Sequence, residues 1–340
     1  MREDAWQPTP TTADVLTART GALGRIRLNR PQSINALTTP MVVAVRRALH
    51  EHAEAGAGAV LLDGAGERGL CAGGDVRAVR ESVLAGTGAG VEFFAEEYAT
   101  DAAVADAPVP VVAWMDGIVM GGGVGLSVHA AVRCVTGRTR LAMPETIIGF
   151  FPDVGALWWL SRAPGQRGTR MALTGGTVGG ADAVALGLAD RLLGAGQLPE
   201  VVDRLAAGGD VSGLGAGREE VTSAWLTDGL DPFFAGDDPV AVVQRLEAAD
   251  DPVARAAAAD IRARSPFAVA VTLAALRRAE TMTSLADVLE QDRRLAPRLA
   301  AHPDFAEGVR AQLVDKDRTP RWTHARLEDV DPTEVAAVLD

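Results

Sequence analysis

Two carboxylates stand in an otherwise apolar, turn-forming segment of this chain, and their placement is the first indication of chemistry. Glu145 and Asp153 belong to the segment 143–155, which reads MPETIIGFFPDVG. A carboxylate held among Ile, Phe and Pro side chains is costly to desolvate, so it usually has a strong partner or a chemical task. This segment therefore holds the first candidates for catalytic residues.

Glycine-rich stretches precede these acids at 117–125 (GIVMGGGVG) and at 69–76 (GLCAGGDV). Glycine exposes backbone N–H groups, and two separate loops that each offer one N–H can bind a developing oxyanion from two sides. The alternative use of Gly121–Gly123 is to let a helix approach a strand closely, and the sequence leaves both uses open. Asp75 is placed to cap a following helix, and Cys71 fits a small buried residue better than a reactive thiol.

Other glycine motifs fit less well. The spacing does not complete the dinucleotide pattern G-x-G-x-x-G, because Leu126 occupies the last glycine position when counting starts at Gly121. No Walker A sequence occurs. Ser127 and His129 lack the closing glycine of the nucleophile motif G-x-S-x-G, so packing of a helix face explains them better.

Composition narrows the class of protein. The chain has 340 residues, 48% of them hydrophobic, and a formal net charge of −12 without a basic stripe, which argues against nucleic acid and anionic membrane as partners. Two cysteines, Cys71 and Cys134, make no disulfide framework, and none of the five histidines lies in a zinc-ligand pattern. With no apolar signal core and no membrane-spanning run, we expect a cytoplasmic protein without a bound metal.

Hydrophobic patterning predicts alternating strands and helices up to about Leu193, hence an α/β core with mainly parallel pairing. Thr39-Pro40 supplies an N-cap and a first-turn proline for a helix. The other expected elements are strands at 23–28, 58–62 and 109–115, and a helix at 126–132 after the glycine cluster.

The pattern changes after Gly194. Residues 194–218 are rich in Gly and Ala, which is typical of a boundary, and helical patterns follow at 285–299 and 305–313. We therefore predict a catalytic core at 13–205 and a helical C-terminal extension at 206–340.

Taken together, the segments 71–75 (CAGGD), 117–125 and 143–155 closely resemble the crotonase (enoyl-CoA hydratase/isomerase) superfamily, and within it the 3-hydroxyisobutyryl-CoA hydrolase branch. The likeness runs in order from about Gly21 to Trp322. It implies an α/β fold, a crotonase-like spiral of repeated ββα units with a C-terminal helical extension.

Two further regions carry the resemblance. Residues 29–37 (NRPQSINAL) are similar to the superfamily's first motif loop, which lies along coenzyme A. The segments 304–311 and 315–322 resemble the C-terminal signature of the hydrolase branch. The superfamily often forms trimers and pairs of trimers, so a homo-oligomer is compatible with the resemblance.

The resemblance also implies roles for particular residues. The backbone N–H groups of Gly74 and Gly122 would form the oxyanion hole, Glu145 would be the principal catalytic acid, and Asp153 its partner at the acyl group. Glu97 matches a position near the substrate in the hydrolase branch, and its alternative is a solvated helix face. The implied substrate-binding residues are Ala72, Gly74, Glu97, Gly122, Glu145 and Asp153.

One position separates hydration from hydrolysis. Hydratases of the superfamily use two glutamates, and the first lies three residues after the oxyanion glycine, where this chain has Gly125. Without a side chain Gly125 cannot activate water, whereas Asp153 offers a carboxylate eight residues after Glu145. The resemblance therefore favours hydrolysis of an acyl-CoA thioester.

The expected substrate is a short 3-hydroxyacyl-CoA, foremost 3-hydroxyisobutyryl-CoA, as in valine breakdown, and this acyl group rests on the resemblance. Coenzyme A is part of the substrate, and no separate cofactor is expected. Two alternatives stay open: an enoyl-CoA hydratase or isomerase, and a non-catalytic acyl-CoA-binding protein that keeps the fold.

Overall fold

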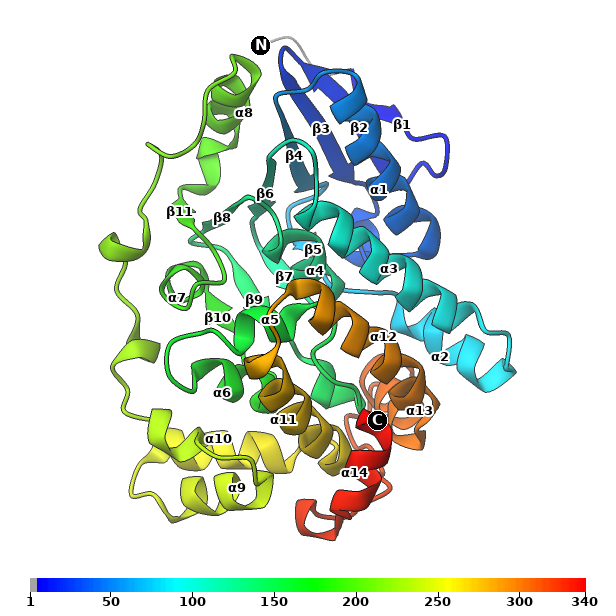
Figure 1. The fold of residues 1–340 in the computed structure, drawn as a ribbon, viewed down its shortest axis with the longest axis vertical. Coiled ribbons are helices and arrows are strands. Elements are labelled where there is room, and N and C mark those ends of the chain that lie inside the picture. Colours follow the sequence, from blue (N-terminus) through cyan, green and yellow to red (C-terminus); the bar gives the residue numbers. More distant parts are fainter. Residues whose placement is uncertain (1–4) are drawn as a thin grey trace. The chain divides into compact units, whose positions relative to one another are not determined.

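The computed structural model describes residues 5–340 (Figure 1). Its larger sheet has seven strands in the order β1-β2-β3-β4-β6-β8-β11. From β3 onward neighbouring strands are parallel, while β1 and β2 are antiparallel additions at one edge. The strands are β1 (Gln7–Pro8), β2 (Val15–Thr20), β3 (Leu23–Leu28), β4 (Ala59–Gly64), β6 (Val111–Met115), β8 (Val132–Thr136) and β11 (Arg191–Leu193).

A smaller sheet of four strands has the order β10-β9-β7-β5. Its strands are β5 (Gly69–Cys71), β7 (Ile118–Met120), β9 (Arg140–Ala142) and β10 (Val178–Gly179). Three times along the chain, a strand of the large sheet is followed by a strand of the small sheet and then by helices: β4-β5, β6-β7 and β8-β9. This repetition confirms the predicted α/β spiral of ββα units.

Helices of different lengths complete these repeats. After β5 come α2 (Val76–Ala85) and α3 (Ala89–Ala105), after β7 comes α4 (Gly122–Val128), and after β9 come α5 (Ala156–Leu160) and α6 (Arg167–Thr174). Helix α1 (Thr39–Glu54) precedes the first repeat, and α7 (Gly180–Ala185) and α8 (Leu198–Ala206) flank β11.

Helix α8 covers part of the large sheet, in which strand β6 (VVAWM) is apolar throughout. Strands buried on both faces read as continuous hydrophobic runs, and every residue of β6 is buried. The hydrophobic cluster under α8 combines side chains of five strands with those of the helix, including Leu23, Leu61, Val112, Cys134, Val201 and Leu205.

The C-terminal part is helical, as predicted, and its α-helices are α9 (Pro239–Ala248), α10 (Pro252–Arg262), α11 (Pro266–Thr281), α12 (Leu285–Ala301), α13 (Pro303–Val309) and α14 (Pro332–Leu339). Five of them begin at proline, which suits the first helical turn because its missing N–H has no partner there. In each of these five, the preceding Asp, Ser or His side chain accepts a hydrogen bond from a first-turn N–H. The sequence therefore marks these starts locally.

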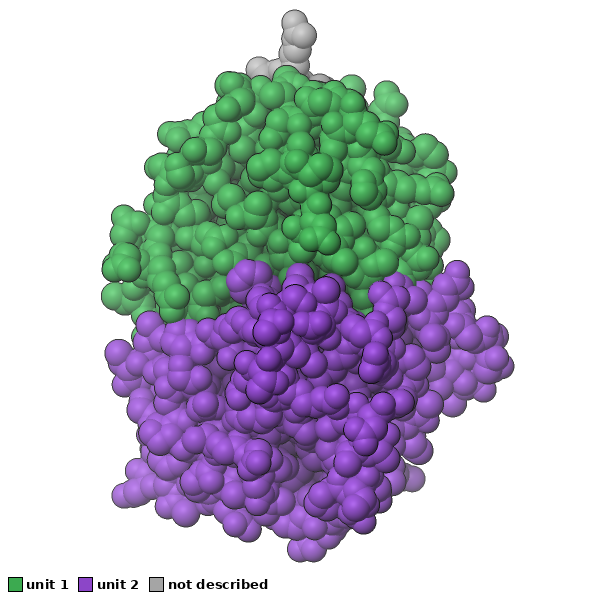
Figure 2. All heavy atoms as spheres, viewed as in Figure 1, with its two compact units in different colours: residues 1–74, 96–141, 178–224 green, residues 75–95, 142–177, 225–340 purple. Residues whose placement is uncertain are grey.

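Two compact units divide the chain (Figure 2). Unit 1 contains residues 1–74, 96–141 and 178–224, and unit 2 contains 75–95, 142–177 and 225–340. The boundary predicted after residue 205 lies inside unit 1, so the compact units are not consecutive halves of the sequence. Segment 142–177, with both candidate acids, shares unit 2 with the C-terminal helices.

Three local expectations need correction. The helix expected at 126–132 begins earlier, at Gly122, and ends at Val128, because Gly122 and Gly123 allow α4 to approach its neighbours more closely than any side chain would permit. The N-cap position of α1 is taken by Thr38 and not by Thr39. The stretch 194–218, expected to be a boundary, contains helix α8.

Candidate active site

The two glycine-rich loops lie side by side in unit 1. Strands β5 and β7 pair in parallel, so their carboxyl ends meet at one edge of the small sheet, and each strand runs directly into a glycine loop. A side-chain Cβ at Gly73, whose φ is +105°, would lie 3.3 Å from the Met120 carbonyl oxygen and 3.7 Å from the Gly122 nitrogen. The two loops therefore lie close enough for the predicted arrangement, in which each loop offers one backbone N–H to the same oxyanion.

The two predicted oxyanion donors differ in exposure, since Gly122 is buried and Gly74 is partly exposed. Within residues 5–340, neither the Gly74 N–H nor the Gly122 N–H donates a hydrogen bond to the protein. Gly122 is the first residue of α4, where N–H groups have no partner inside the helix. The packing use of these glycines is confirmed, because a Cβ at Gly123 would lie only 2.6 Å from the Cys71 carbonyl oxygen. The catalytic use of Gly74 and Gly122 stays a prediction.

Cys71 braces the first loop as a structural thiol. Its Sγ donates to the Asn35 carbonyl oxygen at 3.2 Å and accepts from the Gly73 N–H at 3.3 Å. Complete burial, opposed by a backbone hydrogen bond at Gly73 and reinforced by the charge of Glu97, raises the pKa of Cys71 to about 12. The interpretation of Cys71 as a small buried residue is confirmed.

Asn35 anchors the predicted coenzyme A loop, residues 29–37, to the same strand. Its buried side-chain amide donates to the Leu70 carbonyl oxygen at 2.9 Å, and its side-chain oxygen accepts from the Arg30 N–H at 2.9 Å. The Ala72 N–H donates to the Ile34 carbonyl oxygen at 2.9 Å, so exposed Ala72 is held next to this loop.

Glu97 is buried, with 2% of its surface exposed, so the alternative of a solvated helix face is wrong. Helix α3 is held against α1 by the Arg46–Glu96 ion pair at 2.5 Å and by the Thr100 hydroxyl, which donates to the Val42 carbonyl oxygen at 3.0 Å. A Cβ at Gly122 would lie 2.1 Å from Glu97 Oε1, which means that the Glu97 carboxylate packs on the Cα of Gly122. The structure therefore brings Glu97 and Gly122 together.

Glu145 begins a short 3-10 helix, Glu145–Ile148, in unit 2 and is 7% exposed. Its carbonyl oxygen accepts from the Phe150 N–H at 3.0 Å, and the next carbonyl, of Thr146, accepts from the Ser265 N–H at 3.2 Å. The start of α11 thus holds the turn that carries the principal candidate acid.

Helix α13 packs closely on the same turn. A Cβ at Gly308 would lie 2.5 Å from the Ile148 carbonyl carbon, and one at Gly149 would lie 2.5 Å from backbone atoms of Asp304. Asp304 is itself buried and accepts from the Ser265 hydroxyl at 2.6 Å. The segment 304–311, part of the predicted C-terminal signature, therefore packs directly on the turn that carries Glu145. This close packing requires glycine at positions 149 and 308.

Asp153 lies at the end of that segment, 5% exposed, in an unusual turn. Val154 has a φ of +54° and Gly155 a φ of +70°, and the Gly155 N–H donates to Asp292 Oδ2 of α12 at 2.7 Å. The sequence reasoning missed Asp292. Its signal was an acid on the apolar stripe formed by Val288, Leu295 and Leu299.

Ser127 and His129 have no nucleophile–base arrangement. The Ser127 hydroxyl donates to the Gly123 carbonyl oxygen at 2.6 Å, one turn earlier in α4, and both residues are buried. The predicted helix-face packing is confirmed for Ser127.

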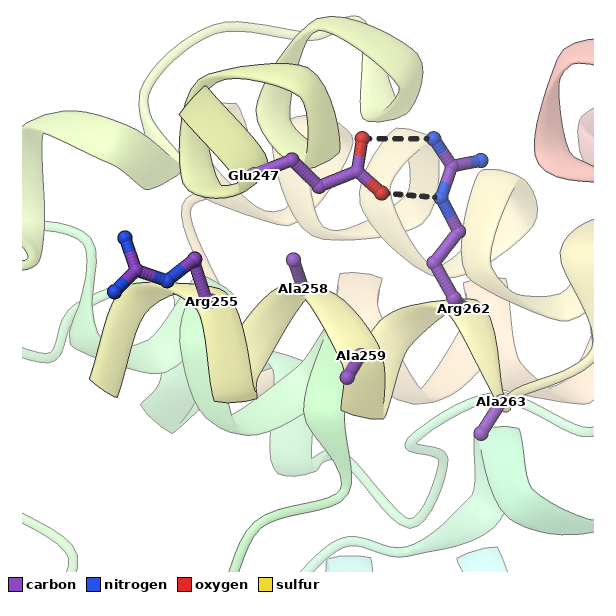
Figure 3. A pocket seen from close by; sticks show the side chains of 6 residues that line it. All are labelled: Glu247, Arg255, Ala258, Ala259, Arg262 and Ala263. Atoms are coloured by element: carbon purple, nitrogen blue, oxygen red, sulfur yellow. Dashed lines mark hydrogen bonds and ion pairs between the residues drawn. The ribbon is translucent and has the colours of Figure 1, made fainter. Parts of the chain in front are cut away.

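The lining of a surface pocket in unit 2 includes none of the predicted site residues (Figure 3). The pocket is lined by α10 residues and by Glu247 of α9, whose carboxylate accepts from Arg262 Nε at 2.9 Å and Nη2 at 3.3 Å. Arg255 donates to the Ala249 carbonyl oxygen at 2.7 Å. Because its charges are already paired, this pocket offers no reactive group.

The fold and the two sets of residues define a class of protein. The profile of the family described as enoyl-CoA hydratase/isomerase matches residues 23–339, and the chain belongs to this family. It is 37% identical to the mitochondrial 3-hydroxyisobutyryl-CoA hydrolase of Gallus gallus, over 95% of this chain and 87% of that protein.

Two solved structures are similar over the whole fold. One is described as a carnitinyl-CoA dehydratase from Mycobacterium thermoresistibile, with 41% identity, a TM-score of 0.91 and 96% of each chain covered. The other is described as an enoyl-CoA hydratase from Rhodobacter sphaeroides, with 39% identity and a TM-score of 0.90, covering 96% of this chain and 97% of that one. The relatives' names thus divide between thioester hydrolysis and reactions of a carbon–carbon double bond.

No helix among residues 5–340 combines the length and apolar character that crossing a membrane requires.

Proposed function

We propose that this protein hydrolyses the thioester of a short 3-hydroxyacyl-CoA, foremost 3-hydroxyisobutyryl-CoA, to the free acid and coenzyme A. The single observation that carries the proposal is the set of acids in the sequence: no carboxylate at position 125, but one at Asp153 in addition to Glu145. Gly125 stands at the position to which the resemblance assigns the first glutamate of the superfamily's two-glutamate hydratases, and the chain keeps Asp153 in the buried turn after Glu145.

Helix α4 offers no other carboxylate that could take the place of the glutamate missing at Gly125. Gly125 lies inside α4, fully surrounded by buried residues, and its N–H donates to the Gly121 carbonyl oxygen at 3.1 Å. No neighbouring residue of α4 has an ionisable side chain, since the helix reads GGVGLSV. A mechanism that adds water with two carboxylates would therefore lack one of them.

In the proposed reaction, the amides of Gly74 and Gly122 stabilise the oxyanion that forms when the thioester carbonyl is attacked. Each such donor contributes roughly 3–4 kcal/mol of transition-state stabilisation. Glu145 either attacks the carbonyl carbon, forming a mixed anhydride, or removes a proton from an attacking water. In both routes the carbon–sulfur bond breaks and the thiolate of coenzyme A leaves.

Asp153 has the second role. It orients the 3-hydroxyl of the acyl group or assists proton transfer as the thiolate leaves, while Glu97 and Ala72 bind substrate beside the Gly122 and Gly74 amides. The reaction uses no metal or redox cofactor, because a thiolate is a good leaving group and the oxyanion has backbone donors. Coenzyme A enters as part of the substrate.

The biological setting is a finer proposal: valine breakdown in the cytoplasm, by a chain that can form homo-oligomers. The two cysteines are buried and free, which suits a reducing compartment. The named relatives of the hydrolase branch are mitochondrial proteins, so the compartment needs its own measurement in the source cell.

The deciding experiment gives the purified protein 3-hydroxyisobutyryl-CoA, 3-hydroxypropionyl-CoA and crotonyl-CoA. We expect free thiol from the two 3-hydroxyacyl esters and only weak loss of the crotonyl double-bond absorbance. Gly125→Glu should not improve hydrolysis. Efficient hydration of crotonyl-CoA without thiol release from any 3-hydroxyacyl ester would identify a hydratase instead, and tight binding without any product would identify a non-catalytic binder.

A further inference from the structure

Asp292 is a fully buried acid that the proposed reaction does not yet use. It lies on α12 with 0% of its surface exposed, among Val288, Leu289, Leu295 and Ala296. Its Oδ2 accepts from the Gly155 N–H at 2.7 Å, and its Oδ1 has no hydrogen-bond partner within residues 5–340. Burial of a carboxyl group in an apolar helix interface is costly, so its presence needs a reason.

The turn that Asp292 holds is strained. Val154 has a φ of +54°, and a β-branched residue is a clear outlier in the left-handed region. Such conformations persist only where surrounding groups enforce them, and they gather at functional sites. Gly155 follows with a φ of +70°, and its N–H is the group that Asp292 binds. This one hydrogen bond therefore fixes the peptide directly after the strained residue.

Asp153 is the residue that this turn presents. Its carbonyl oxygen accepts from the Ala156 N–H at 2.9 Å, so the four residues from Asp153 to Ala156 form one closed turn into α5. Because the backbone on both sides of Val154 is bonded, the direction of the Asp153 side chain depends on the Gly155 amide. Without its acceptor on α12, the turn could relax toward ordinary backbone angles.

Charge supports a neutral state of Asp292. Burial first, and then the nearby charge of Asp153, raise the pKa of Asp292 well above its usual value, against the opposing effect of the Gly155 hydrogen bond. Two carboxyl groups in one apolar site cannot both ionise cheaply. Helices α2, α11, α13 and α14 pack against α12, and except for exposed Glu81 their charged groups have partners of their own: Arg77, Arg80, Arg277, Arg278, Glu280, Asp304, Glu307 and Glu334.

We propose that Asp292 is a positioning residue which, as a neutral carboxylic acid, binds the Gly155 amide and thereby holds the strained turn that aims Asp153. The proton resides on Oδ1, since Oδ2 accepts the hydrogen bond. The inference rests on the proposed function in one respect only, namely that Asp153 acts on the acyl group.

The first test compares Asp292→Asn with Asp292→Ala in thiol release from 3-hydroxyisobutyryl-CoA. Asparagine is neutral and retains an oxygen that can accept from the Gly155 N–H, so kcat of Asp292→Asn should stay within about threefold of the parent. Alanine removes the acceptor, so Asp292→Ala should lower kcat about tenfold or more with little change in KM. Gln291→Ala is the matched control, because it removes a buried hydrogen bond of α12, to the Ala275 carbonyl oxygen at 3.3 Å, that does not touch the turn.

The control should lose stability but keep kcat. The proposal is overturned if folded Asp292→Ala turns over like the parent, if Asp292→Asn is as impaired as Asp292→Ala, or if Gln291→Ala loses turnover to the same degree.

The second test does not depend on catalysis. The folded-state pKa of Asp292 is raised, so the folded protein binds more protons than the unfolded chain in the window above the usual Asp pKa, and folding stability falls as pH rises through that window. The side chain of Asp292→Asn cannot ionise, so this variant does not lose folding stability in that pH window. Its melting temperature minus that of the parent should therefore grow as pH rises above about 4.

If the melting temperatures of Asp292→Asn and the parent differ by the same amount at every pH, Asp292 ionises normally and the proposal is refuted. The two failures are distinguishable: a parent protein without thiol release refutes the proposed function, while the melting comparison still decides whether Asp292 is a neutral anchor.

Discussion

At the scale of single residues, burial decides which polar groups can do chemistry. Glu145, Asp153 and Glu97 are all less than a tenth exposed, and desolvated carboxylates of this kind are the acids and bases that enzymes use. Cys71 is equally buried but inert, because burial favours its neutral thiol. Burial thus makes the carboxyl groups candidates for acid–base chemistry, whereas it makes the thiol unreactive.

Glu145→Gln should keep acyl-CoA binding within a few-fold and lower turnover by about two or more decades, the scale expected when a general base or nucleophile is removed. The amide is nearly isosteric, so packing should survive. Calorimetric binding and thiol release measure the two effects, and exposed Glu81→Gln on α2 is the control. Undiminished turnover in the folded variant would remove Glu145 from the mechanism.

The thiols provide a prediction from pKa. Burial raises the pKa of Cys71 and of Cys134 to about 12, so neither thiol ionises near pH 8. A thiol-specific chromogenic disulfide should find no reactive cysteine in the native protein and both cysteines after unfolding in guanidinium. Rapid labelling of the native protein would show that one thiol is accessible as thiolate. If the prediction holds, assays of coenzyme A release carry no background from the protein.

At the scale of elements, backbone proximity brings together the loops of the two predicted oxyanion donors, Gly74 and Gly122. Parallel strands β5 and β7 end at one edge, and Gly73 and Gly122 have no side chains to separate their loops. Helices α11, α12 and α13 have the corresponding task in unit 2, where Ser265, Asp292 and Gly308 contact the segment 145–155. Each candidate residue is therefore placed by an element distant in sequence.

Gly122→Ala should lower kcat about tenfold or more, because its methyl group would lie 2.1 Å from Glu97 Oε1 and 3.0 Å from Leu37 Cδ1. Either Glu97 or the Gly122 amide must then move. Gly137→Ala is the matched control, since its Cβ would meet no atom within 4 Å. Circular dichroism accompanies the assay, and a folded Gly122→Ala with parental kcat would mean that neither group takes part in the reaction.

At the scale of the whole molecule, unit 2 is built from three separate stretches of chain. The segment 142–177 has partners in the helices after residue 225: Ser265 and Asp292 form hydrogen bonds to it, and the backbone of Asp304 packs on Gly149. Segments that are joined only by long-range packing fold cooperatively and lose their structure together. The C-terminal helices are thus required for the turn that carries Glu145 and Asp153.

A chain that ends at residue 224 should therefore fail to melt cooperatively and should form aggregates, because the apolar surface of segment 142–177 loses its cover. A chain that ends at residue 330 is the control: it lacks only α14, in which Val335 is the one buried residue. Thermal melting and size-exclusion chromatography make the comparison. A soluble, cooperatively melting fragment 1–224 would contradict this account of unit 2.

Local features of the sequence were enough for much of the fold. Strand 23–28 has the predicted bounds, and the helix predicted at 285–299 is α12, because hydrophobic period, capping residues and prolines act over a few neighbouring positions. Glu145 and Asp153 were candidates because a carboxylate among apolar residues is costly to desolvate, whereas Gly74 and Gly122 were assigned through the resemblance to the crotonase superfamily. Their catalytic roles stay predictions.

Tertiary structure decided the rest. Burial of Glu97, the early start of α4 and the hydrogen bond from Gly155 to Asp292 each depend on residues far away in the chain, the last spanning 137 positions. Sequence periodicity reports which face of a helix is apolar, but not what meets that face. An acid on an apolar stripe such as Asp292 becomes interpretable only when the packed partner, here a strained turn beside Asp153, is known.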